Sequence, residues 1–162
     1  MDRTAIIKSA ILSGKALDRK LAYWRFKGYS IVFTNGCFDI IHRGHAEYLA
    51  RAAGMGDVLV VGLNTDRSVG AIKGPGRPLQ DEESRSFLLA SLSFVSAVVL
   101  FDEDTPIELI RRVKPAVLVK GSDYSREEIV GHDIVAGWGG RVETISLVEG
   151  YSTSSIIGRI SG

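Results

Sequence analysis

The sequence predicts a three-layer α/β/α fold in which helices cover both faces of a five-stranded parallel sheet. Short apolar runs alternate with amphipathic segments along the 162 residues. The runs are continuous in Val, Ile and Leu, as expected of parallel strands that are buried on both faces. The helical segments between them supply the right-handed crossovers that such strands need. We therefore expect one domain over residues 1–162, including an extra N-terminal helical segment at about 1–28.

The elements follow from the periodicity of the apolar residues. The expected strands are 30–34, 57–64, 97–101, 116–120 and 141–146, and the expected helices are 44–53, 81–93, 105–113, 126–137 and 152–160. Within the N-terminal segment, Leu17, Leu21 and Trp24 form one apolar stripe. This stripe is expected either to pack internally or to form an interface with another subunit.

Composition excludes several classes of protein. Hydrophobic residues make up 45% and charged residues 24%, which is ordinary for a globular protein. The net charge of +1 gives no reason to expect nucleic acid or an anionic membrane as a partner. A single cysteine, Cys37, excludes a disulfide framework, and we expect it to be a small packed residue. No apolar run could span a membrane, and Lys8 interrupts the only apolar stretch near the N-terminus. A cytoplasmic protein is expected.

Residues 34–45, TNGCFDIIHRGH, are the most informative segment. A strand runs into a turn at Gly36, and a His-x-Gly-His then opens a helix. His42 and His45 would share one face of the first helical turn, beside its free N–H groups. Gly44 would allow a phosphate to approach the backbone. This is an anion site, and a triphosphate suits it best. Zinc ligands and ordinary surface histidines are the alternatives. For zinc no third ligand is near, since His132 is distant in sequence and no cysteine pair exists.

Polar segments follow four predicted elements, at 34–45, 64–73, 120–124 and 149–155. In open α/β sheets, ligands bind beyond the carboxyl ends of the strands. We therefore expect these segments, which are far apart in sequence, to meet at one edge of the sheet.

The glycine- and proline-rich loop at 71–78 carries two cations that suit phosphate oxygens. Lys73 offers a point charge and Arg77 a planar fork, although a solvated loop is the simpler explanation. Asp39 either orients a histidine, holds Mg²⁺ or stabilises a turn. Asn35 and Asn64 end two strands and either pin loops or touch the nucleotide.

Two further segments have both a functional and a simple explanation. In 120–124, Gly121 would admit a ligand to the backbone and Asp123 could accept from a base amine or a ribose hydroxyl, but a plain turn explains these residues equally well. Ser152, Thr153 and Ser154 open the last helix, where hydroxyl side chains are normal caps. With the free N–H groups they would also make a second anion cradle.

Together these motifs resemble the HxGH nucleotidyltransferase superfamily, and in particular the D-glycero-β-D-manno-heptose 1-phosphate adenylyltransferase family in a stand-alone form. The resemblance covers about residues 29–160. Its marks are TNGCFDIIHRGHAEYL at 34–49, NTDRSVGAIKGPGRP at 64–78, ESR at 83–85, EDTP at 103–106, VLVKGSDY at 117–124 and EGYSTSSII at 149–157. It implies a Rossmann-like fold with a five-stranded parallel sheet.

The resemblance also implies a reaction: transfer of AMP from ATP to a sugar 1-phosphate, with release of pyrophosphate and with Mg²⁺ bridged mainly by the substrate phosphates. It makes His42, His45 and Lys73 the catalytic residues, which stabilise the phosphates in the transition state. The implied nucleotide-binding residues are Asn35, Gly36, Phe38, Asp39, Gly44, Arg85, Lys120, Gly121, Asp123, Ser152, Thr153 and Ser154. The implied residues for the sugar phosphate are Asn64, Lys73 and Arg77.

This chain departs from the family pattern at two points. The usual Gly-Gly-Asp-Tyr is Gly-Ser-Asp-Tyr here, and the usual Ser-Thr-Thr is Ser-Thr-Ser. A cytidylyltransferase acting with CTP on glycerol 3-phosphate or a phospho-alcohol would share the histidines, Lys73 and the hydroxyl-rich helix start. A catalytically silent nucleotide sensor is a third reading, although binding alone needs fewer aligned cations. The resemblance further implies a homodimer or a higher homo-oligomer.

Overall fold

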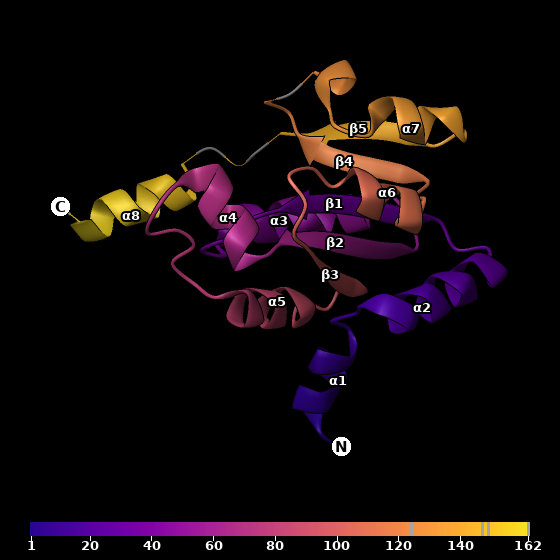
Figure 1. Cartoon of the computed structure of the whole chain (residues 1–162), viewed down its shortest axis with the longest axis horizontal. Coiled ribbons are helices and arrows are strands. Elements are labelled where there is room, and N and C mark those ends of the chain that lie inside the picture. The colour runs from indigo at the N-terminus through magenta and orange to yellow at the C-terminus, as the bar shows by residue number, and fades with distance from the viewer. Residues whose placement is uncertain (124, 147, 149, 162) are drawn as a thin grey trace.

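Five parallel strands form the centre of the computed structural model (Figure 1). They are β1 (Ile31–Gly36), β2 (Val58–Asn64), β3 (Ala97–Phe101), β4 (Val117–Gly121) and β5 (Arg141–Ile145), in the spatial order β3-β2-β1-β4-β5. All five strands lie where the sequence predicts them. The structure describes residues 1–123, 125–146, 148 and 150–161. Tyr124 and Glu149, from two of the predicted polar segments, lie outside this part of the chain.

Helices connect and flank the strands. They are α1 (Arg3–Ser9), α2 (Gly14–Phe26), α3 (Arg43–Ala53), α4 (Asp66–Lys73), α5 (Glu82–Ala90), α6 (Ile107–Val113), the 3₁₀ turn η1 (Arg126–Glu128), α7 (His132–Gly137) and α8 (Thr153–Ser161). Among the described residues, no helix combines the length and the apolar character that a membrane crossing requires.

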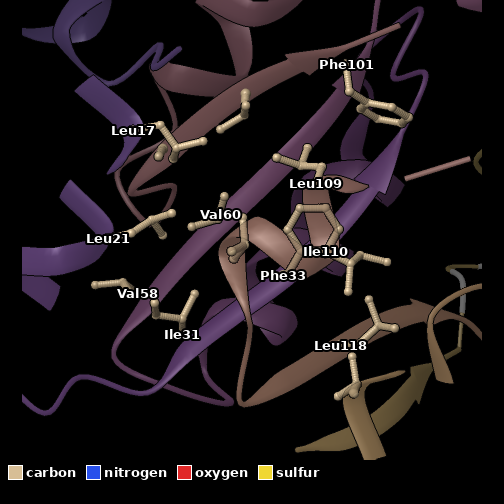
Figure 2. Packing of buried hydrophobic residues seen from close by; sticks show 14 of the residues in the cluster. Leu17, Leu21, Ile31, Phe33, Val58, Val60, Phe101, Leu109, Ile110 and Leu118 are labelled. Carbon is tan, nitrogen blue, oxygen red and sulfur yellow. The ribbon is translucent and has the colours of Figure 1, made fainter. Parts of the chain in front are cut away.

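Two apolar clusters, one on each face of the sheet, form the core. Helices α2, α6 and α7 pack on one face, while α3 and α5 pack on the other. Strand β1 shows the alternation: Ile31 and Phe33 point into the first cluster and Val32 into the second. Figure 2 shows Phe33 among the side chains of the first cluster. The predicted three-layer fold is therefore confirmed.

The N-terminal segment differs from the continuous helical region predicted for residues 1–28. It contains two helices, and residues 10–12 between them run parallel to β3, where the N–H of Leu12 donates to the carbonyl of Val98 at 2.8 Å. Leu17, Leu21 and Trp24 are at most 3% exposed, within the core that α2 covers. Of the two predicted arrangements for this stripe, internal packing is the one observed.

Two other local predictions were wrong. Residues 66–73 form helix α4, so the loop predicted at 71–78 begins only after Lys73. The Thr65 hydroxyl accepts from the N–H of Ser68 and caps this helix, which no proline interrupts. The helix predicted at 126–137 is split. Ile129 is extended and Gly131 has φ +94°, so α7 begins only at His132. Lys73 thus ends a helix, which fixes the position of its Cα.

Candidate active site

A cavity of about 230 Å³ lies at the carboxyl ends of the central strands. Its walls come from the end of β1, from α3, from the end of α4, from the end of β4 and from α8. The lining residues are Asn35, Gly36, Cys37, Phe38, Asp39, His45, Tyr48, Lys73, Lys120, Gly121, Asp123 and Thr153. Segments separated by more than a hundred residues therefore meet at one sheet edge, as their positions after the strands predict.

A second, smaller cavity of about 130 Å³ adjoins the first and shares His45 and Thr153 with it. Its lining residues are His42, Gly44, His45, Val148, Tyr151, Ser152 and Thr153. The beginnings of α3 and α8 meet at this cavity, so free N–H groups of two helix starts lie beside the histidine pair.

The two histidines are held against each other. His42 is the N-cap of α3, and its Nδ1 accepts from the backbone N–H of His45 at 3.4 Å. The ring centres lie 3.8 Å apart with an angle of 20° between their planes, and the edge of Phe38 packs on His45. Because Nδ1 of His42 is an acceptor, its proton sits on Nε2, which leaves that atom as a donor.

The pKa of each histidine is shifted in the same direction. Burial, reinforced by the neighbouring His42, lowers the pKa of His45 to about 4. Burial also lowers the pKa of His42. Both rings are therefore neutral at pH 7 in the absence of ligand, and they act as hydrogen-bond donors. Among the described residues, Nδ1 of His45 is buried and lacks a partner.

Two glycines and one strained residue lie around the histidine pair. A Cβ at Gly44 would lie 3.0 Å from the His42 ring and 3.1 Å from the Tyr151 Cβ, and a Cβ at Gly36 would lie 3.0 Å from the Phe38 ring. Phe38 itself has φ +44°, an unfavourable conformation for a bulky residue. Strain of this kind is concentrated at functional sites.

Two lysines from different elements line the larger cavity. Lys73 extends from the last turn of α4, and Lys120 from the end of β4. The ammonium of Lys120 donates to the Asn35 carbonyl at 3.2 Å, and burial lowers the pKa of this lysine to about 8.

The Asp39 carboxylate is used to anchor the loop at 77–80. It accepts from Arg77 Nε at 2.6 Å and from the N–H groups of Leu79 and Gln80 at 2.7 and 3.1 Å. Although burial opposes ionisation, these bonds hold the pKa of Asp39 below its usual value. Three of the roughly four acceptor positions of this carboxylate are therefore used within the protein, which favours the role of Asp39 in the turn. Within the described residues there is no cluster of three His, Cys, Asp or Glu that could hold a metal ion.

Arg85, expected at the β- and γ-phosphates, is fully buried and lines neither cavity. Its guanidinium donates to the carbonyls of Gln80, Cys37 and Asn64 at 2.7–2.9 Å and to the Asp66 carboxylate at 2.7 Å. In this arrangement it ties together the loops after β1 and β2 and helix α4.

Three other predicted residues also have internal partners or lie away from the cavities. The Asn64 amide donates to Ser68 at 2.9 Å, and Asn64 is buried. The hydroxyl of Ser152 accepts from the Ser155 N–H at 3.0 Å, as a helix cap does, while Ser154 is exposed and lines neither cavity. Of the hydroxyl triplet, Thr153 is the member that lines both cavities.

Sequence reasoning did not select Tyr48 and Tyr151, and it assigned Cys37 to packing. Tyr48 lies one helical turn after His45, a spacing that places both side chains on one face of α3. Its hydroxyl bonds to Thr34 at 2.8 Å and to the Val119 carbonyl at 3.2 Å, and burial raises its pKa to about 12. Burial also raises the pKa of the Cys37 thiol, so this cysteine is a poor nucleophile.

The five-stranded parallel sheet with helices on both faces is the fold of nucleotidyltransferases. The profile of the cytidylyltransferase-like family matches residues 33–159, so this chain belongs to that family. Among curated proteins it is 52% identical over 152 residues to the bifunctional protein HldE of Bradyrhizobium diazoefficiens and 55% identical over 152 residues to that of Syntrophotalea carbinolica. Each alignment covers 94% of this chain but 31% of the relative, so the chain spans about a third of their length.

A solved structure supports the same assignment. The lipopolysaccharide core biosynthesis protein from Thermoplasma volcanium is 28% identical and superposes with a TM-score of 0.60. The match covers 77% of this chain and all of that protein.

Proposed function

We propose that this protein is an adenylyltransferase that transfers AMP from ATP to a sugar 1-phosphate, D-glycero-D-manno-heptose 1-phosphate, and releases pyrophosphate to form ADP-heptose. The observation that carries the proposal is the convergence of His45, Lys73 and Lys120 on one cavity, with His42 stacked on His45 and lining the adjoining cavity. Imidazole N–H donors and ammonium groups are the groups that stabilise phosphate oxygens.

The proposed reaction requires little covalent chemistry from the protein. A phosphate monoester has its second pKa near 6, so at neutral pH it is already a dianion and needs no general base. The phosphate oxygen attacks the α-phosphorus of ATP, and the bond to the pyrophosphate breaks. The barrier is the approach of two anions and the growth of charge on the leaving group. Positioned donors and cations lower it.

Neutral histidines suit this task because they donate hydrogen bonds without the desolvation cost of a buried charge. When the leaving pyrophosphate gains charge beside His42 and His45, the protonated form of each ring becomes more favourable. We infer that the triphosphate lies along the smaller cavity and the starts of α3 and α8, with its α-phosphorus near His45, the residue shared by both cavities.

Mg²⁺ is part of the proposal as an ion carried by the substrate phosphates. When bound, it would neutralise phosphate charge. The internal partners of Asp39 support a site built mainly by the substrate, so we derive no step through a protein-held metal.

Three observations support a sugar 1-phosphate as the acceptor. The first is the resemblance of residues 117–124 to the heptose 1-phosphate adenylyltransferases. The others are the identity of 52–55% to the bifunctional relatives and the likeness in structure to a lipopolysaccharide core biosynthesis protein. A homodimer and a cytoplasmic location remain predictions of the sequence.

The second candidate is a cytidylyltransferase that uses CTP, which the description of the matching family favours. Pyrophosphate release should be measured for ATP, CTP, GTP and UTP, each paired with heptose 1-phosphate, other sugar 1-phosphates and glycerol 3-phosphate. We expect release with ATP and a sugar 1-phosphate. Turnover with CTP and glycerol 3-phosphate alone would support the second candidate, and no turnover with any pair would contradict both.

A further inference from the structure

The most informative unexplained group is the ammonium of Lys120. It is partly buried at the end of β4, and its one observed partner is the backbone carbonyl of Asn35 at 3.2 Å. Among the residues that the structure describes, it forms no salt bridge within 4 Å. An ammonium has three N–H donors, so two remain for a ligand.

The charges around the larger cavity do not balance this lysine. Lys73 lies on the same cavity and likewise forms no salt bridge among the described residues. The Asp39 carboxylate already accepts hydrogen bonds from Arg77 and from two backbone N–H groups. Asp123 is the other carboxylate on the cavity wall. Two ammonium groups therefore share a small cavity with one available carboxylate, an arrangement that favours an anionic ligand.

We propose that the Lys120 side chain binds a substrate phosphate in the larger cavity, which Lys73 also lines. This inference rests on the proposed function and deepens it, because the resemblance names Lys120 only as one of the nucleotide-binding residues. The phosphate is either that of the acceptor or the α-phosphate of the nucleotide. Either way, two ammonium groups on one cavity would hold the two reacting phosphates together.

The pH dependence of binding follows from this position. The titratable or charged groups that face Lys120 across the cavity are Cys37, Asp39, His45, Tyr48, Lys73 and Asp123. The pKa of Lys120 is lowered to about 8, whereas those of Cys37 and Tyr48 are raised above their usual values of 9.0 and 10.0. Lys120 is protonated below pH 8 and loses its charge above it, so phosphate binding should weaken on the alkaline side of pH 8.

The test compares Lys120→Met, which removes the charge and retains the stem, with the exposed control Lys27→Met. A hydrogen bond to a charged group contributes a factor of roughly 10 to 100 in binding. We expect kcat/KM of Lys120→Met to fall by about that factor, while Lys27→Met matches the parent. The substrate whose KM rises, when each is varied at saturation of the other, identifies the phosphate that Lys120 holds.

The pH profile separates ligand binding from a merely structural effect. We expect kcat/KM of the parent to decline above about pH 8 and the decline to be absent in Lys120→Met. Thermal unfolding should show that the variant is folded. A folded Lys120→Met protein with the parent's KM values and the parent's alkaline decline would overturn the proposal.

A binding experiment keeps this inference distinct from the proposed function. If no pair of substrates turns over, calorimetry with inorganic phosphate, a single phosphate group of the kind proposed for the larger cavity, still tests Lys120. Weaker phosphate binding by Lys120→Met than by Lys27→Met would support the anion site even though the proposed reaction had failed. Equal binding by the two variants would reject it.

Discussion

Arg85 Nη2 donates to Oδ1 of Asp66 at 2.7 Å, so a guanidinium without exposed surface joins α5 to the first turn of α4. Its remaining bonds go to the backbone carbonyls of Cys37 after β1, of Asn64 at the end of β2 and of Gln80 before α5. Since α4 ends at Lys73, Arg85 supports the position of a proposed catalytic residue from inside the protein. Its contacts are those of a positioning residue.

We predict that Arg85→Met is strongly destabilising. Removal of one partner from a buried charge network typically costs about 3–5 kcal/mol. Urea unfolding measures this change. Arg67→Met is the matched control, because Arg67 pairs with Asp102 at the surface and is 72% exposed. Loss of such an exposed pair should change the free energy of unfolding far less, because water screens the two charges. An Arg85→Met protein of normal stability with a raised KM for ATP would instead support direct phosphate binding.

His45→Ala should lower kcat by roughly 10²–10³-fold, the usual cost of removing one donor to a developing anion. Steady-state pyrophosphate release at saturating substrates measures the change. His132→Ala, on the partly exposed helix α7, is the control and should retain full activity. Near-normal turnover by a folded His45→Ala protein would contradict the assignment.

The lowered pKa of His45 predicts sensitivity to acid. The folded protein holds this ring with a pKa of about 4, against an ordinary value of 6.5 for an exposed histidine. Between these values the unfolded chain binds more protons, so the free energy of unfolding falls as pH falls from about 6.5 to 4. His45→Gln should show a smaller loss of melting temperature between about pH 7 and pH 5. An identical loss of melting temperature in the parent and in His45→Gln would mean that His45 is not the group responsible for the acid sensitivity.

Asp39→Asn should leave the Mg²⁺ requirement unchanged. The carboxylate anchors Arg77, Leu79 and Gln80, so we expect a lower melting temperature. Loss of a group that binds or orients a metal weakens metal affinity roughly 10- to 100-fold. Titration of activity with MgCl₂ should give the parent's half-saturating concentration. A tenfold increase would place Mg²⁺ on Asp39.

Leu21→Ala should reveal α2 as part of the core. This side chain is 1% exposed, and truncation of a buried leucine costs about 2–5 kcal/mol. Tyr23→Ala, on the same helix with Tyr23 49% exposed, is the control and should cost far less. Urea unfolding compares the two. Equal, small losses would mean that α2 is only loosely attached.

The fold was largely predictable because strand burial leaves a strong signal. All five strands appear as Val- and Ile-rich runs, and their ends locate the cavity. Helix α4 was not predicted, because its short apolar pattern is followed by glycines and prolines, which are typical of a loop. The cap at Thr65 and the acidic Asp66 were the signals that would have revealed it.

Individual contacts in the site were less predictable, since the sequence does not show which partner a charged side chain will choose. Arg85 and Asp39 have the chemistry of phosphate and metal ligands, but the fold places carbonyls, N–H groups and countercharges around them. Lys120 shows the reverse case. The resemblance implies only that Lys120 belongs to the nucleotide-binding residues. The structure shows that its side chain is a cation that forms no salt bridge among the described residues.

The short extended stretch at residues 10–12 has a consequence for solubility. By bonding to Val98 it occupies the outer side of β3, the border strand of the sheet. Exposed strand borders are templates for self-association, and natural proteins shield them. Here residues 10–12 act as the shield, so their removal should expose the unpaired edge of β3 and promote aggregation while the residues of the proposed site stay in place.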